Sequence, residues 1–105
     1  MSALTYRKIY DRISTSSPAQ VGQYGPLWRV LKIQEEAGEV AEAVIGYAGV
    51  NARKGQTFDE GPVAKELADV VVTAMVALHD WVASPSQFME EHLEGLLKRI
   101  KEEGS

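Results

Sequence analysis

The sequence contains no cysteine among its 105 residues. This absence excludes a disulfide framework, a thiolate zinc site and a cysteine nucleophile. No stretch approaches the roughly 20 apolar residues that a membrane span requires. The N-terminal segment lacks the character of a signal peptide, so we expect a cytoplasmic protein with no membrane partner. Aromatic residues are few, at 8%, but a hydrophobic content of 45% is too high for a disordered chain.

The charge balance is acidic. Eleven Lys and Arg residues oppose 15 Asp and Glu residues, which gives a formal net charge of −4. This balance argues against a nucleic-acid partner and leaves small molecules and proteins as the expected partners. A chain this short buries only about two thirds of its unfolded surface when it folds alone. We therefore expect a homodimer or homotetramer.

Prolines mark the starts of the predicted helices. Pro26, Pro62 and Pro85 each follow glycine or serine, and proline is favoured in the first turn of a helix. Together with apolar residues at spacings of three and four, they predict helices over 2–14, 26–48, 62–82 and 85–102. No segment alternates apolar and polar residues over the length of a strand. The predicted fold is all-α: one domain over 1–105, a four-helix bundle-like protomer whose core is completed by oligomerisation.

An acidic patch lies on the predicted helix 26–48. Glu35, Glu36 and Glu39 are three or four residues apart, so their side chains share one face, opposite an apolar arc. A solvated helix face is the ordinary explanation for such a patch. This helix alone does not decide whether the three glutamates form a solvated surface or a functional site.

The predicted helix 62–82 also carries aligned polar residues, although it is apolar almost all the way round. Such a helix is usually covered by neighbours on most sides. Glu66, Asp69, Thr73 and Asp80 fall within about 60° of one another at 3.6 residues per turn. Carboxylates on a buried helix are costly unless they are paired or bind a metal.

Two arrangements would satisfy these carboxylates. The first is a set of structural ion pairs with Lys65, Arg29, Lys32 or a basic residue of the helix 85–102. The second is a metal ion that bridges them to the facing glutamates of the helix 26–48. A ligand set of oxygens alone suits Mg²⁺ or Mn²⁺ better than zinc or copper.

The acidic residues form two motifs on successive helices. Glu35-Glu36-Ala37-Gly38-Glu39 reads as EExxE, and Glu66-Leu67-Ala68-Asp69 reads as ExxD. This pair of motifs resembles that of the MazG-like all-α nucleoside triphosphate pyrophosphohydrolases. The family also includes dimeric dUTPases, dCTP pyrophosphatases and phosphoribosyl-ATP pyrophosphohydrolases.

The resemblance implies a Mg²⁺-dependent hydrolase that clears or balances nucleotide pools. Water would attack the α-phosphorus of a nucleoside triphosphate and release the monophosphate and pyrophosphate. Glu36, Glu39, Glu66 and Asp69 would ligate Mg²⁺, for which Mn²⁺ could substitute. Glu35 and Glu36 would be catalytic, with Glu35 holding or deprotonating the attacking water.

Six residues are candidates for substrate binding: Trp28, Arg53, Lys54, Thr73, Lys98 and Arg99. Trp28 projects to the acidic side of its helix, where an indole could stack on a nucleobase or pack against another helix. The four basic residues could hold the phosphate tail or be ordinary surface charges. Thr73 could contact substrate or bond back to a helix carbonyl.

Two other functions remain open from the sequence. A phosphoribosyl-ATP pyrophosphohydrolase-like enzyme would carry the same motifs, because base selection depends on the shape of the pocket. A non-catalytic helical module for nucleotide binding or dimerisation would be stabilised by Mg²⁺ and nucleotide without forming product.

Overall fold

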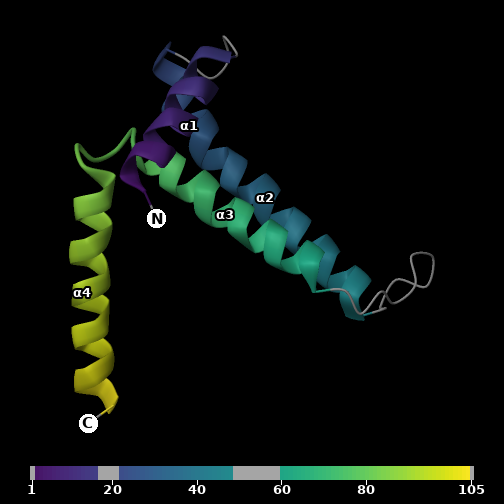
Figure 1. Ribbon diagram of the computed structural model, residues 1–105, viewed down its shortest axis with the longest axis vertical. Helices are drawn as coiled ribbons and strands as arrows, with labels where there is room; N and C mark the ends of the chain where they lie inside the picture. The colour runs from purple at the N-terminus through teal and green to yellow at the C-terminus, as the bar shows by residue number, and fades with distance from the viewer. Residues whose placement is uncertain (1, 17–21, 49–59, 105) are drawn as a thin grey trace.

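The computed structural model describes residues 2–16, 22–48 and 60–104. These residues form four α-helices and one short 3₁₀ helix (Figure 1). The elements are α1 (Ala3–Ser16), η2 (Gly22–Tyr24), α2 (Gly25–Ala48), α3 (Gly61–Leu78) and α4 (Pro85–Gly104). The described part of the chain contains no strand, so the all-α prediction is confirmed. Arg53 and Lys54, two of the candidate phosphate-binding residues, lie outside the described ranges.

The helix starts follow the proline positions. α2 and α3 begin one residue before Pro26 and Pro62, and α4 begins at Pro85. The missing amide hydrogen of proline costs nothing in a first turn, where the amides have no partner in the helix. At the start of α1, the backbone amide of Thr5 donates to the Ser2 hydroxyl at 3.4 Å, the usual role of a serine cap.

The predicted end of the third helix at residue 82 is wrong, because α3 ends at Leu78. Beyond that point the amides of His79, Asp80 and Trp81 each donate to the carbonyl three residues back, at 3.0 to 3.2 Å. This is the tighter pattern of a 3₁₀ turn, which commonly ends an α-helix. Apolar residues resume at Trp81 and Val82 after His79 and Asp80, so composition alone did not reveal where the helix ends.

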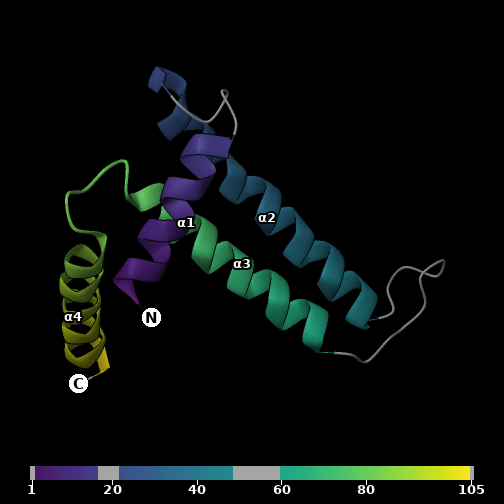
Figure 2. The same ribbon diagram turned by 45° about the horizontal axis from the view of Figure 1, so that its top comes forward.

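α2 and α3 lie side by side and antiparallel and make the most extensive contact between elements, and α1 crosses the C-terminal half of α3 (Figures 1 and 2). α4 leaves this three-helix body and extends away from α2 in both views. Among the described residues, none of the helices combines the length and apolar character required to cross a membrane.

The buried core is small and lies where α1 meets α3. Tyr6, Met75, Val76 and Ala77 are its buried apolar residues. Nearer the N-terminal end of α3, Leu67 is 51% exposed, because within one chain this part of α3 is covered mainly on its side toward α2. The predicted burial of the helix on most sides is therefore met only at its C-terminal end.

The face of α2 that meets α3 carries both acidic and apolar residues. Glu36 and Glu39 are half-buried there, as are Ile33 and Val40, whereas Leu31 on the other side is 66% exposed. A surface helix ordinarily buries its apolar stripe. Here carboxylates lie inside the helix pair and part of the apolar stripe is left uncovered.

Candidate metal centre and adjoining cavity

Three glutamates from two helices converge between α2 and α3. Glu36 and Glu39 of α2 and Glu66 of α3 each offer one carboxylate oxygen, and these oxygens lie within 4.8 Å of one another. All three residues are half-buried. Glu36 and Glu39 are three residues apart and so share the face of α2 that meets α3. The prediction that EExxE and ExxD face each other is met by these three residues.

Two lysines supply positive charge near the cluster: Lys65 beside Glu66, and Lys32, whose pKa is raised mainly by its hydrogen bond to Glu35 and further by Glu36 and Glu39. Oε2 of Glu66 is buried and makes no hydrogen bond with any described residue. Oε1 of Glu66 lies 3.4 Å from Nζ of Lys65, but the Lys65 side chain is 70% exposed and its charge is therefore screened by water. An uncompensated buried carboxylate oxygen is costly, and a cation would remove that cost.

The crowding of carboxylates also changes the acidity of Glu39. Its pKa is raised, first because a proton on Glu39 can be shared with the Glu66 carboxylate, and second because of the negative charge of Glu36. Like charges at such short range disfavour the ionised form. Carboxylate oxygens are the ligands that hard divalent cations such as Mg²⁺ prefer, so three of them gathered at one point could hold such an ion.

The other two predicted acidic residues lie outside the three-glutamate cluster. Asp69 is one turn from Glu66 on α3, and its Oδ2 lies 3.0 Å from Nζ of Lys65. Glu35 is exposed and lies 3.0 Å from Nζ of Lys32. Asp69 therefore forms an ion pair of the kind that the sequence allowed as an alternative for the third helix, whereas the pair of Glu35 with Lys32 was not predicted.

A cavity of about 270 Å³ adjoins the cluster and shares Glu36 with it. α1, α2 and α3 all contribute to its lining, which consists of Ile13, Trp28, Arg29, Lys32, Glu36, Val72, Thr73 and Val76. Trp28 and Thr73, two of the predicted substrate-binding residues, thus lie beside one cavity. An indole next to a pocket of this kind is suited to stacking on a planar ring.

Sequence reasoning missed Ile13 as a lining residue and treated Lys32 only as an ion-pair partner. For Lys32 a signal was available, because Trp28, Lys32 and Glu36 recur every four residues and so form one stripe on α2. For Ile13 there was none, since its place depends on how α1 crosses the other helices.

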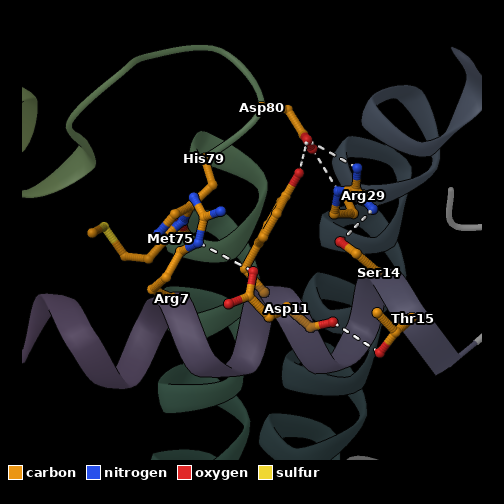
Figure 3. A network of polar contacts seen from close by, with 9 residues as sticks. Arg7, Asp11, Ser14, Thr15, Arg29, Met75, His79 and Asp80 are labelled. Atoms are coloured by element: carbon orange, nitrogen blue, oxygen red, sulfur yellow. Dashed lines mark hydrogen bonds and ion pairs between the residues drawn. The ribbon is translucent and has the colours of Figure 1, made fainter. Parts of the chain in front are cut away.

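A buried polar network adjoins this cavity through Arg29, which lines it (Figure 3). Arg29 donates through Nε and Nη2 to both oxygens of Asp80, with an Nη2–Oδ1 distance of 2.9 Å. Tyr10 donates its hydroxyl hydrogen to Oδ1 of Asp80 at 2.6 Å, and the Arg29 guanidinium lies over the Tyr10 ring at 4.9 Å from its centroid. The network joins α1, α2 and the turn after α3.

The ionisation of this network follows from its contacts. Burial opposes ionisation of Asp80, but the hydrogen bonds from Arg29 and Tyr10 outweigh it and lower the Asp80 pKa. The hydrogen bond to Asp80 raises the pKa of Tyr10 and also that of Arg29. Asp80 was predicted to share the stripe of Glu66 and Asp69, but it lies beyond the end of α3. Its ion pair with Arg29 is one of the structural pairs that the sequence allowed.

The remaining candidates lie elsewhere. Lys98 and Arg99 are exposed on the C-terminal half of α4, the helix that diverges from α2 (Figures 1 and 2). They do not line the cavity beside Glu36. His79 packs against the Tyr10 ring, with 5.2 Å between ring centroids, as expected for a packed histidine.

Comparisons of the chain with protein-family models, curated proteins and solved structures gave no match.

Proposed function

We propose that the chain is a divalent-cation-dependent nucleoside triphosphate pyrophosphohydrolase, which converts a ribo- or deoxyribonucleoside triphosphate and water to the monophosphate and pyrophosphate. The observation that carries the proposal is the convergence of Glu36, Glu39 and Glu66 beside a cavity lined by Trp28. The EExxE and ExxD motifs support it through their resemblance to the MazG-like family.

The acidic residues would hold the cation. Glu36, Glu39 and Glu66 offer their oxygens already gathered, and Asp69 lies one turn from Glu66. When bound, Mg²⁺ would supply positive charge for the polyphosphate and acidify a coordinated water. Glu35 directly precedes Glu36 on α2 and would accept a proton from the attacking water, a contribution of roughly 10²–10⁴-fold.

The adjoining cavity would hold the nucleoside. Trp28 offers an aromatic face, and Thr73 offers a hydroxyl that can donate and accept. Lys32 contributes a positive charge to the lining of the cavity and interacts electrostatically with Glu36 and Glu39. Since Glu36 belongs to both the cavity and the cluster, a nucleotide with its base in the cavity would direct its phosphates toward the cation site.

The same proposal includes a second copy of the chain. Leu27, Leu31 and Ile45 are exposed on the outward face of α2, and Leu67 and Val71 on that of α3. Soluble monomers rarely expose contiguous apolar surface on this scale. A homodimer formed through these faces would bury them and complete the core.

The test is a panel of nucleoside triphosphates, modified ones included, incubated with Mg²⁺ and assayed for pyrophosphate. Turnover of at least one nucleotide is expected, and Glu39→Gln should reduce it to background while preserving the helical circular dichroism. Glu42→Gln is the matched control, because Glu42 is exposed on α2 and outside the cluster. Thermal stabilisation by Mg²⁺ and nucleotide without any product would instead indicate a non-catalytic binding module.

A further inference from the structure

Two further cavities lie where α1 crosses the end of α3 and the chain turns into α4 (Figure 1). Their volumes are about 230 Å³ and about 240 Å³, and they share the lining residues Tyr6, Met75 and Ser86. Neither shares a lining residue with the cavity beside the glutamates. Each alone is smaller than a usual ligand pocket, but together they reach the range of roughly 300–1,000 Å³.

The cavity of about 230 Å³, the polar cavity, is lined by polar and basic side chains and by no acidic one. Arg7, His79, Ser84 and Ser86 all belong to its lining. Nε of Arg7 donates to Asp11 at 3.1 Å in an exposed pair, and the guanidinium has further N–H groups that can donate to an anion. The lining therefore favours a negatively charged group.

His79 narrows the chemistry of that group. Its Nδ1 lies 3.0 Å from the carbonyl oxygen of Met75, which can only accept, so Nδ1 carries the hydrogen and Nε2 of the neutral ring is an acceptor. A carboxyl group can interact with Nε2 in two ways. As an acid it donates its proton, and as a carboxylate it pairs with the protonated ring.

The cavity of about 240 Å³, the apolar cavity, is lined mainly by hydrophobic side chains. Met89 and Leu93 of α4 lie there beside Met75 and the buried Tyr6. Leu93 is 54% exposed, so an apolar ligand would cover surface that the described chain leaves open. Glu90 is the charged residue of this lining, and it would repel a second anionic group.

We propose that the two cavities form one binding site for a free monocarboxylate with an unbranched apolar tail. The carboxyl group lies in the polar cavity with Arg7 and His79. The tail passes over Met75 into the apolar cavity and packs against Met89 and Leu93. A ligand bound in this way contacts α1, the end of α3 and α4 at once, and its binding is independent of the proposed catalytic function.

Methionine methyl resonances report occupancy, since Met75 and Met89 line the site. The chain, labelled with carbon-13 at these methyl groups, is titrated with butanoate, hexanoate, octanoate and decanoate below their micelle-forming concentrations. Both resonances should shift saturably, and each added methylene should tighten binding by up to about fourfold until the tail fills the apolar cavity. Octylamine and octanedioate should bind more weakly than octanoate. No saturable shift with any carboxylate, or equal affinity for octylamine, would overturn the proposal.

Variants locate the two ends of the ligand. Arg7→Gln should weaken decanoate binding by about threefold, as expected for an exposed charge, and Leu93→Ser by about tenfold. Arg12→Gln and Leu97→Ser are the matched controls, because both residues are exposed on the same helices but outside the two linings. Both controls should bind as the wild type does.

Leu31→Ser separates this site from the outward apolar face of α2, and it should leave the affinity unchanged. Helical circular dichroism confirms that each variant is folded. Wild-type affinity in Arg7→Gln or Leu93→Ser, or a loss of affinity in Leu31→Ser instead, would place the ligand elsewhere and overturn the proposal.

Discussion

Arg29 on α2 donates two hydrogen bonds to the carboxylate of Asp80, which lies 51 residues further along the chain. Both side chains are buried, with 7% and 5% of their surfaces exposed. Tyr10 of α1 donates to the same carboxylate. One carboxylate therefore ties three segments together beside the cavity that Arg29 lines.

Asp80→Asn should destabilise the fold strongly. Loss of one partner from a buried ion pair leaves the other charge uncompensated, at a cost of about 3–5 kcal/mol. Urea denaturation followed by circular dichroism measures the change in unfolding free energy. The matched control is Asp11→Asn in the exposed Arg7–Asp11 pair, where we expect a loss of no more than about 1 kcal/mol. Equal losses in the two variants would contradict the role assigned to Asp80.

Tyr10→Phe gives a milder test of the same network. The variant removes one hydrogen bond to Asp80 but keeps the ring that packs against His79 and lies under Arg29. We expect a loss of about 1–3 kcal/mol, the usual range for a buried acceptor that loses a partner. Tyr24→Phe, at an exposed tyrosine, is the control and should leave the unfolding free energy unchanged.

The lowered pKa of Asp80 predicts acid sensitivity. Because the folded state holds Asp80 ionised to a lower pH than the unfolded state does, its contribution is complete above the usual aspartate pKa. That contribution is lost as the pH falls through the lowered folded value. Unfolding free energies measured below about pH 4 should therefore decline less steeply in Asp80→Asn than in the wild type. An identical slope in both proteins would refute the assignment.

The sequence was sufficient to predict the helices and three residues of the cluster. Proline positions and apolar spacing are local signals, and they gave the starts of α2, α3 and α4 within one residue. Glu36, Glu39 and Glu66 were found because two acidic motifs fell on successive helices. These features depend on residues near one another in the chain or on two adjacent helices.

What the sequence could not give depends on long-range packing. Periodicity showed that α2 has an acidic side and an apolar side, but not that Glu36 and Glu39 would face α3 together with Ile33 and Val40. The sequence offered Arg29 as one possible partner of the carboxylates on the third helix, but no local pattern selects Asp80, which lies 51 positions from Arg29 and 70 from Tyr10. The divergence of α4 likewise depends on the turn after α3.

Glu66→Gln should raise the midpoint of thermal unfolding in the absence of Mg²⁺ and reduce the stabilisation that Mg²⁺ provides. Without the cation, removal of one charge relieves repulsion with Glu36 and Glu39, and the midpoint of thermal unfolding should rise. With Mg²⁺, the wild type should gain stability from binding, whereas the variant should gain less. Glu42→Gln should respond to Mg²⁺ as the wild type does. A lower midpoint for Glu66→Gln without Mg²⁺ would argue against the repulsion.

The raised pKa of Glu39 predicts a pH dependence of the opposite sign to that of Asp80. Between the usual glutamate pKa and the raised value, the folded state binds more protons than the unfolded state does. In the absence of a cation, the Glu39 contribution to stability should fall as the pH rises through this window. Since Mg²⁺ favours the ionised form, its binding should release a proton there, which calorimetry in buffers of different ionisation enthalpy detects. Binding without proton release in that window would contradict the assignment.

Leu31→Glu and Leu67→Glu should each reduce the mass of the assembly, because each places a charge on an outward apolar face. Leu4→Glu is the matched control, since Leu4 is as exposed as Leu31 but lies on α1. Sedimentation velocity separates the species. An unchanged mass in both face variants would show that these faces are not the interface.

The most direct test of the central claim is pyrophosphate release from nucleoside triphosphates, measured with Mg²⁺ for the wild type, Glu39→Gln and Glu42→Gln in parallel. We expect Mg²⁺-dependent release by the wild type and by Glu42→Gln, and background levels from Glu39→Gln. No release from any nucleotide by the wild type, or a wild-type rate for Glu39→Gln, would contradict the account.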